Sequence, residues 1–382
     1  MAIKPRKFYL LEKTKMDIPN GKCQTIEHRA LVLGPFPEPT HGFSVATDAI
    51  ASIFEASGFN VVRCDLAPGR GDSLVGRSLD FVRRLGRAAG EIFRPGRKIC
   101  YFGFSGGGRQ IIDIVLIAAA RMTRAPVFLH HHSFAYINRR SRLTNVALKL
   151  AGKDAVHVVL GRGMGDRLSA TYPSVCHVLV VSNFALVVRE VAGSPRPVRE
   201  PPTLAYFSNI TLEKGFDTYL KILEEIHQHS VPFQALVAGP FADPMCKIRF
   251  EAALEKGLPI KYIGPVYGNA KKAFLADIDL LIFPTRYVNE AEPIVLIEAI
   301  SSGIPIIASD RGCIADILRF GGGLLVSETK WTDTSEWIAQ QISDGTYIGN
   351  LNNNAYLSAL RLNKESKAQI ANLISIISNI FH

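Results

Sequence analysis

Residues 290–309 read EAEPIVLIEAISSGIPIIAS, a stretch that combines a loop, a helix and a strand. Pro293 suits the first position of a helix, and Gly303 suits the residue after its end. The apolar run from Pro305 is typical of a short strand. This pattern places Glu298 inside the helix and Glu290 just ahead of it, so two carboxylates bracket the junction between loop and helix.

The start of this predicted helix could hold a phosphate group. The N–H groups of a first helical turn have no partner within the helix, and the helix dipole adds positive charge there. Glu298 would lie about 7.5 Å further along, at 1.5 Å per residue. This is roughly the distance from the diphosphate of a nucleotide to its ribose. The stretch therefore predicts a nucleotide diphosphate site with a carboxylate near the ribose.

The arrangement resembles the Glu-x7-Glu signature of retaining glycosyltransferases of family 4, which have the two-domain GT-B fold. Further segments follow in the family's order, namely LAYFSN with LEKGFD (204–217), QALVAG (234–239), IGPV (263–266) and ADIDLLIFPT (276–285). Over residues 28–190 the likeness is looser and depends on spacing. The resemblance implies an α/β fold in which two Rossmann-like parallel-sheet domains face a central cleft.

Length and patterning also favour two domains. A chain of 382 residues is long enough for two separate cores. Apolar strands alternate with helical segments, which is typical of a parallel sheet covered by helices. The proline-rich run 195–202 interrupts this pattern. We therefore predict domains at 1–198 and 199–350, a polar loop at 350–354, and a C-terminal helical segment at 351–382 that the resemblance directs back toward the first domain.

The resemblance also assigns roles to residues of the second domain. It implies that Glu298 binds the ribose hydroxyls and that Glu290 contacts the donor sugar. Lys214 would face the diphosphate. The family often has Gly-Arg where this chain has Ser208 and Asn209, so neutralisation of the diphosphate would depend more on Lys214 and the helix start at Pro293, or on another arginine such as Arg286. The implied donor-binding set is Gly42, Asn209, Lys214, Pro293, Ile294, Val295 and Glu298, and the implied catalytic set is Glu290, His132 and Lys214.

Two segments of the first domain carry the looser part of the likeness. The loop 34–43 follows a strand and opens a helix, as the family's Gly-Gly loop does, although His41 replaces its first glycine. The run of His130, His131 and His132 ends another strand, and His132 best matches the family's active-site histidine. Neighbouring strand residues point to opposite faces, so the three imidazoles cannot easily converge. We predict no metal and no cofactor.

Other functions remain open at this point. Residues 103–107, GFSGG, fit the Gly-x-Ser-x-Gly elbow of a serine hydrolase with Ser105 as nucleophile. The histidines after residue 132 show no convincing pattern of an acid followed by a loop-borne histidine, and a hydrolase leaves Glu290 and Glu298 unexplained. A nucleotide-sugar epimerase and an inactive GT-B binding scaffold are further alternatives.

The distribution of charge limits the kinds of partner that the protein could have. Residues 1–190 contain 27 Lys and Arg against 14 Asp and Glu, a net charge of +13, whereas the remainder has 17 against 20, a net of −3. The basic half could face an anionic acceptor or an anionic membrane, through residues such as Arg83, Arg84 and Arg87. The arginines are not interleaved with stacking aromatic residues, which argues against nucleic acid.

The location expected from the sequence is the cytoplasm. We find no uncharged apolar run near 18 residues, and no signal-type apolar core follows the charges of residues 1–7. The six cysteines are scattered without Cys-x-x-Cys spacing, as expected of reduced packing residues. The resemblance thus implies a retaining glycosyltransferase that moves a sugar from a nucleotide-sugar donor to a glycan or lipid-linked acceptor in polysaccharide or glycoconjugate synthesis, with possible peripheral contact at the inner membrane face.

Overall fold

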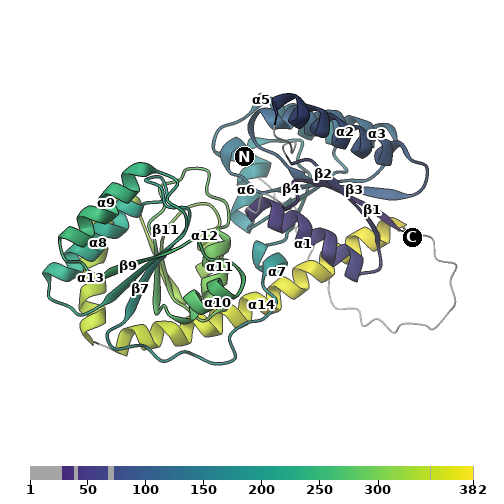
Figure 1. The fold of residues 1–382 in the computed structure, drawn as a ribbon. Coiled ribbons are helices and arrows are strands. Elements are labelled where there is room, and N and C mark those ends of the chain that lie inside the picture. Colours follow the sequence, from purple (N-terminus) through teal and green to yellow (C-terminus); the bar gives the residue numbers. More distant parts are fainter. Residues whose placement is uncertain (1–27, 38–41, 68–72, 345, 382) are drawn as a thin grey trace, which may run out of the picture.

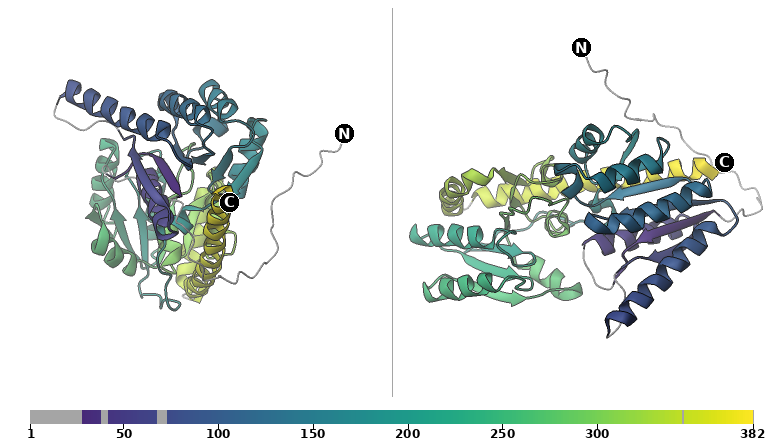
Figure 2. Two further views of the ribbon diagram at one scale, coloured as in Figure 1. Left: turned by 90° about the vertical axis from the view of Figure 1, so that its right-hand side faces the viewer. Right: turned by 90° about the horizontal axis from the view of Figure 1, so that it is seen from above.

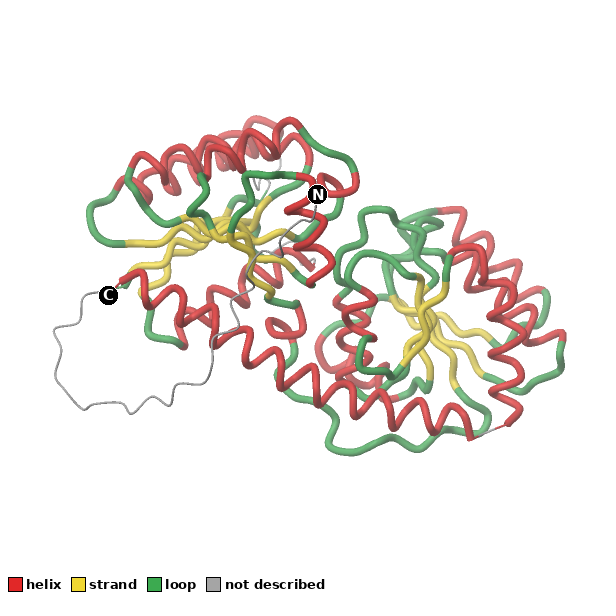
Figure 3. Tube along the Cα trace, turned by 180° about the vertical axis from the view of Figure 1, so that it is seen from behind, coloured by secondary structure: helices red, strands yellow, loops and turns green. Residues whose placement is uncertain are grey.

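The computed structural model describes residues 28–37, 42–67, 73–344 and 346–381, which form two α/β domains connected by a linker and by a long C-terminal helix (Figure 1). Each domain contains one six-stranded sheet in which every strand pair is parallel. The predicted fold class is therefore confirmed. Figure 3 shows the two sheets enclosed by helices on both faces.

The first sheet has the strand order β2-β1-β3-β4-β5-β6. Every residue of β1, β3 and β4 is buried, which explains why these strands read as continuous apolar runs rather than as alternating patterns. The strands are β1 (Arg29–Gly34), β2 (Asn60–Asp65), β3 (Lys98–Phe104), β4 (Val127–His131), β5 (Val156–Val159) and β6 (His177–Val180).

Helices cover both faces of this sheet. One face packs against α2 (Leu74–Phe93), α3 (Gln110–Met122), α5 (Arg142–Ala151) and α6 (Arg162–Thr171). The other packs against α1 (Gly42–Ala56), α7 (Asn183–Val187) and the end of α14 (Thr346–Phe381). A short helix, α4 (Ala135–Asn138), and a 3-10 turn, Gly107–Arg109, complete the described part of the domain.

The second sheet has the strand order β12-β11-β10-β7-β8-β9. Its strands are β7 (Thr203–Phe207), β8 (Gln234–Ala238), β9 (Ile260–Gly264), β10 (Leu280–Phe283), β11 (Ile306–Ser309) and β12 (Gly323–Val326). Its helices are α8 (Phe216–Gln228), α9 (Pro244–Glu255), α10 (Gly268–Ala276), α11 (Ile294–Ser301), α12 (Ile314–Leu318) and α13 (Trp331–Asp344), with a 3-10 turn at Glu328–Lys330.

The linker between the domains runs from residue 188 to residue 202, and the predicted division after residue 198 falls within it. Its arginines attach it to the end of α10. Arg196 Nη1 donates to Leu275 O at 2.7 Å, and Arg199 Nη1 lies 3.1 Å from a carboxylate oxygen of the buried Asp279. The linker is thus fixed to the second domain.

Helix α14 spans both domains (Figures 1 and 3). Ala355 and Leu362 pack in the core of the second domain, whereas Leu373 and Phe381 pack beneath the first sheet. The predicted loop at 350–354 is wrong, because these residues lie inside this helix. The polar run is tolerated there because Asn352 is buried and its amide donates to Arg196 O of the linker at 3.3 Å.

Candidate functional site in the interdomain cleft

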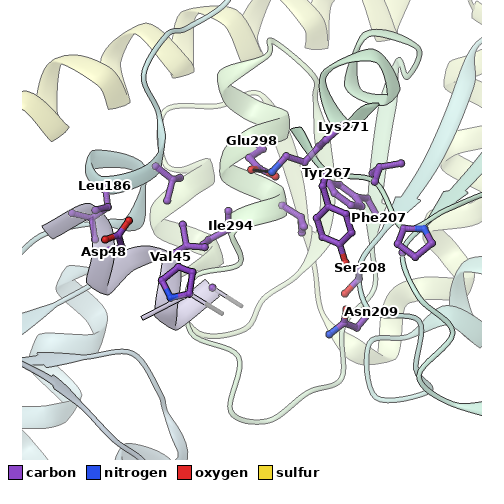
Figure 4. Close-up of a pocket in the computed structure, with 18 of the residues that line it drawn as sticks. Val45, Asp48, Leu186, Phe207, Ser208, Asn209, Tyr267, Lys271, Ile294 and Glu298 are labelled. Atoms are coloured by element: carbon purple, nitrogen blue, oxygen red, sulfur yellow. Dashed lines mark hydrogen bonds and ion pairs between the residues drawn. The ribbon is translucent and has the colours of Figure 1, made fainter. Parts of the chain in front are cut away.

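A cleft of about 470 Å³ lies between the two domains (Figure 4). This volume is within the range of roughly 300–1,000 Å³ that is typical of small-molecule sites. Five of the seven predicted donor-binding residues line it, namely Gly42, Asn209, Ile294, Val295 and Glu298. The cleft adjoins the carboxyl ends of β7, β8 and β9, where ligands of open parallel sheets usually bind.

The start of α11 forms one wall of the cleft. Pro293 precedes this helix as its N-cap instead of occupying the predicted first position, and the helix begins at Ile294. The N–H groups of Leu296 and Ile297 donate to Pro293 O at 3.1 and 3.4 Å. Within the described residues, no hydrogen bond uses the N–H groups of Ile294 or Val295. These two donors are therefore available to an anion in the cleft.

Glu298 lies about one turn further along α11. It forms an ion pair with Lys271 of α10. The two side chains are 19% and 29% exposed, so both partners can still be reached from the cleft. Figure 4 shows the carboxylate and the ammonium group facing each other beside Tyr267. The pair gives this wall one anionic acceptor for hydroxyl groups and one cation.

Lys271 and Tyr267 are not among the site residues predicted from the sequence, although both line the cleft. Tyr267 is 68% exposed, which is unusual for so large an aromatic side chain. Their position in the sequence could have indicated this, because both residues follow the IGPV segment at the end of a parallel strand. The carboxyl ends of such strands meet at one edge of the sheet, so the residues behind each of them are candidates for the same site.

Lys214 and Glu290, two of the three predicted catalytic residues, form an ion pair with each other. Lys214 Nζ donates to Glu290 Oε2 at 2.5 Å, and the hydroxyl of Thr285 donates to the same oxygen at 3.2 Å. Glu290 is only 7% exposed. Lys214 Nζ also lies 4.9 Å from the centre of the Tyr287 ring. These residues follow the neighbouring strands β7 and β10, at the same sheet edge as the cleft, but neither is part of the cleft lining described above.

Local structure fixes the position of Lys214. Its N–H donates to Thr211 Oγ1 at 3.2 Å, and its carbonyl accepts from the hydroxyl of Tyr206 at 3.2 Å. Gly215 follows with φ of 76°, and a Cβ atom there would lie 1.9 Å from the carbonyl oxygen of Pro284. Only glycine fits this backbone and this space, which gives the Lys-Gly pair of the sequence a structural reason.

Arg286 is not part of the cleft lining. Its guanidinium lies 2.8 Å from Asp217 Oδ1 and donates to Leu212 O at 2.6 Å and to Thr218 Oγ1 at 3.0 Å. These bonds attach the loop after β10 to α8. Arg286 therefore does not replace the positive charge that the family has at the positions of Ser208 and Asn209. Lys271 and Arg189 are better candidates, because both line the cleft.

The first domain meets α11 through Gly42, where an added Cβ atom would lie 3.4 Å from Ile294 Cδ1. The neighbouring Phe43 packs on His132, with ring centres 4.8 Å apart. The rings of His132 and His130 are 4.0 Å apart, which confirms that they share one face of the strand. Burial lowers the pKa of His132 to about 3, so its imidazole is neutral at physiological pH.

His131 points to the opposite face of β4. Its Nδ1 lies 3.0 Å from the hydroxyl of Tyr136, and its Nε2 lies 3.1 Å from Nδ1 of His157. Across the described ranges there is no group of three or more His, Cys, Asp or Glu side chains that could hold a metal ion.

Ser105 is bonded to an acid instead of to a histidine. Its hydroxyl donates to Asp113 Oδ1 at 3.4 Å, and its N–H donates to Asp113 Oδ2 at 2.9 Å. Burial raises the pKa of Asp113 to about 6. The carboxylate thus closes the turn after β3, and the hydrogen bonds found for Ser105 include none of the kind that would activate a hydrolase nucleophile.

The second domain is similar to a known protein family. Residues 188–358 match the family model described as glycosyl transferases group 1. The chain is also 23% identical over 218 residues to the sulfoquinovosyl transferase SQD2 of Arabidopsis thaliana. The matched part makes up 53% of this chain and 40% of that protein, so the chain spans less than half of that relative's length.

Solved structures share the whole architecture. HepE of Anabaena, in complex with UDP, superimposes with a TM-score of 0.65 at 15% identity, over 91% of this chain and 99% of that protein. WaaG, a glycosyltransferase involved in lipopolysaccharide biosynthesis, gives a TM-score of 0.59 at 15% identity with the same coverage. The chain therefore has the two-domain GT-B fold, and its residues 188–358 are similar to the glycosyl transferases group 1 family.

Proposed function

We propose that the protein is a glycosyltransferase that moves a sugar from a nucleotide-sugar donor to an acceptor hydroxyl with retention of configuration. The observation that carries this proposal is the wall of the cleft formed by α11. It combines two available N–H groups at Ile294 and Val295 with the carboxylate of Glu298. The family match of the second domain supports it, as do the structures of HepE in complex with UDP and with UDP-glucose.

The donor would lie mainly on the second domain. Its diphosphate would accept hydrogen bonds from the start of α11, where the helix dipole favours negative charge. The ribose hydroxyls would donate to Glu298, which is held in place by Lys271. Lys214 would supply positive charge to the diphosphate, and the side chain of Asn209 would border the same space (Figure 4).

The sugar would then face Glu290 and, from the first domain, His132. Because the imidazole of His132 is neutral, it can donate a hydrogen bond to a sugar hydroxyl without placing a second cation beside Lys214. The departing diphosphate would take the acceptor proton on the face that it leaves. No enzyme nucleophile is required, so stabilisation of the developing negative charge by Lys214 and α11 would supply much of the catalysis.

The acceptor would enter from the basic first domain as a glycan or a lipid-linked saccharide, in polysaccharide or glycoconjugate synthesis in the cytoplasm. Two alternatives make different use of the same cleft. A nucleotide-sugar epimerase would convert the donor without an acceptor, and an inactive scaffold would bind the donor without consuming it.

Titration calorimetry with UDP and UDP-glucose tests the donor site. Glu298→Gln removes a charged acceptor, which is worth about 1.5–3 kcal/mol, so the dissociation constant should rise about 10- to 150-fold. The matched control is Glu251→Gln, because Glu251 is also an ion-paired helical glutamate, bonded to Lys247 at 3.9 Å on α9. Equal affinities of the two variants for every nucleotide tested would refute the assignment of Glu298.

A further inference from the structure

A buried carboxyl group joins the loop before α11 to the first domain. Glu292 of this loop is 6% exposed. Its Oε1 atom lies 2.6 Å from Ser182 Oγ, and its Oε2 atom accepts from the N–H group of Asn183 at 2.6 Å. The side-chain amide of Asn183 also donates to Glu292 O at 3.0 Å. Because Ser182 and Asn183 form the start of α7, which packs beneath the first sheet, Glu292 connects the two domains.

Further contacts link the same two domains at separate points. The carboxylate of Asp316, on α12, accepts from the N–H group of Arg162 at the start of α6. The side-chain amide of Asn138, on α4, donates to Val288 O at 2.5 Å. We call these two contacts, together with those of Glu292, the domain junction.

Glu292 differs from the other members of the domain junction in its position in the chain. It lies two residues after Glu290 and two residues before Ile294, the first residue of α11. In the proposed function Glu290 contacts the sugar and the start of α11 contacts the diphosphate. A shift of Glu292 would therefore move groups that face both parts of the donor.

Helix α14 supports the same junction. Figure 2 shows this helix, in yellow, passing from one domain to the other. The side chain of its Gln369 accepts from the N–H group of Ser182 at 3.0 Å. A cavity of only about 10 Å³ lies between Glu292, α12 and α14, which is about the room that a single water molecule needs. The carboxyl group of Glu292 is therefore enclosed almost entirely by protein.

Burial also determines the charge of Glu292. It raises the pKa of this carboxyl to about 8. The bonds from Ser182 and Asn183 lower the pKa, the charge of Asp316 raises it, and the charge of Arg319 lowers it. Because the carboxyl is mostly protonated at neutral pH, glutamine matches both its shape and its charge. A glutamine amide can accept from the N–H group of Asn183 and donate to Ser182 Oγ.

We propose that Glu292 is a positioning residue that holds the first domain in place against the wall of the cleft formed by α11. Its bonds to Ser182 and Asn183 fix the loop 290–293 from the side of the first domain. They thereby keep His132, which belongs to the first domain, at a constant position relative to Glu290. The effect on sugar transfer rests on the proposed function, whereas the effect on the domain junction does not.

Hydrogen exchange measured by mass spectrometry tests the domain junction without any ligand. Glu292→Ala removes two hydrogen bonds between the domains. We expect exchange at residues 162–165, at the start of α6, to become about tenfold faster or more, because their contact with Asp316 depends on the same placement of the domains. Glu292→Gln should exchange as the wild type does. Faster exchange that is confined to the residues around Glu292 would reveal a local packing role and would overturn the proposal.

Two more variants complete this experiment. Ser182→Gly removes the hydroxyl that faces Glu292 from the first domain, and glycine in place of serine before a helix costs little stability. It should therefore speed exchange at α6 in the same way, even if Glu292→Ala fails to fold. The control is Glu225→Ala, which removes a carboxylate bonded to Ser335 within the second domain. Equal acceleration at α6 in this control would also overturn the proposal.

Enzyme kinetics test the consequence for the proposed reaction. With a donor that the wild type consumes, Glu292→Ala and Ser182→Gly should lower kcat about 10- to 100-fold, because the groups around the sugar lose their alignment. The dissociation constant of the matching nucleoside diphosphate should be nearly unchanged, since the nucleotide would lie mainly on the second domain. Glu292→Gln should retain the wild-type kcat.

The outcomes separate this inference from the proposed function. A wild type that consumes no donor would refute the proposed function, and hydrogen exchange would still decide the role of Glu292 in the domain junction. Wild-type kcat in both Glu292→Ala and Ser182→Gly would refute the positioning role and leave the proposed function intact. A loss of nucleotide affinity as large as the loss of kcat would assign Glu292 to the donor wall itself, which also contradicts a positioning role.

Discussion

Substitution of Lys214 by methionine should destabilise the second domain even before activity is considered. Lys214 neutralises Glu290, which is only 7% exposed and, among the described residues, otherwise accepts one side-chain hydrogen bond, from Thr285. Methionine keeps most of the apolar stem of lysine but removes the ammonium group. The variant leaves a buried carboxylate without its cation, which is a costly state in a folded protein.

The size of the effect follows from the geometry. Two unit charges 2.5 Å apart attract by about 6–7 kcal/mol at an effective dielectric constant of about 20. The cost of removing both groups from water cancels part of this attraction, and breaking one partner of a buried pair typically costs about 3–5 kcal/mol. The side chain of Lys214 is 22% exposed, so water can replace part of the interaction. We therefore expect a loss of about 2–4 kcal/mol in the free energy of unfolding.

A double-mutant cycle measured by urea unfolding isolates this interaction. Glu290→Gln removes the buried charge, so Lys214→Met/Glu290→Gln should recover most of the stability that Lys214→Met loses. All three variants should lose donor turnover, because both groups are proposed to act on the donor. A coupling energy near zero, or a Lys214→Met protein as stable as the wild type, would refute the view that the two residues neutralise each other.

Three further predictions concern other parts of the molecule. Gly215→Ala should destabilise the second domain by more than about 1 kcal/mol in urea unfolding, because its Cβ atom would collide with Pro284 O; a neutral effect would contradict the observed turn. Donor turnover should survive chelators, since cationic groups and a helix start can neutralise the diphosphate; activity that returns only with magnesium or manganese would be evidence against this. Burial lowers the pKa of His157 to about 3, whereas the unfolded value is about 6.5. The unfolded state thus binds more protons between these values, and stability should fall as the pH is lowered from about 6.5 toward 3. His157→Gln should flatten this dependence, and an unchanged pH profile would refute the argument.

Central strands such as β3 and β10 could be predicted because they are largely apolar runs of seven and four residues bounded by turn residues. Burial on both faces leaves such runs few polar positions. Helix α14 was predicted only in part. Its polar stretch at 350–354 reads as a loop, whereas in the structure Asn352 donates to the linker residue Arg196, 156 positions away in the chain. Local patterns cannot reveal a contact of that kind.

The candidate site, too, could be predicted only in part. The start of α11 and the carboxylate of Glu298 follow from local helix signals, and the structure places both on the cleft. The pairing of Glu298 with Lys271 depends instead on how α10 packs beside α11, and that of Arg286 with Asp217 on how two loops meet. The sequence therefore indicates which charged side chains lie at this edge of the sheet, but it does not reveal which of them form ion pairs with each other.

The most direct test of the proposed function is the stereochemistry of donor hydrolysis. Purified protein would be incubated with a panel of α-linked UDP-, GDP- and ADP-sugars without acceptor, and proton NMR would follow the sugar that is first released. A retaining glycosyltransferase should consume at least one donor and release the α anomer first. Release of the β anomer first, accumulation of an epimerised nucleotide sugar, or no consumption of any donor would contradict the proposal.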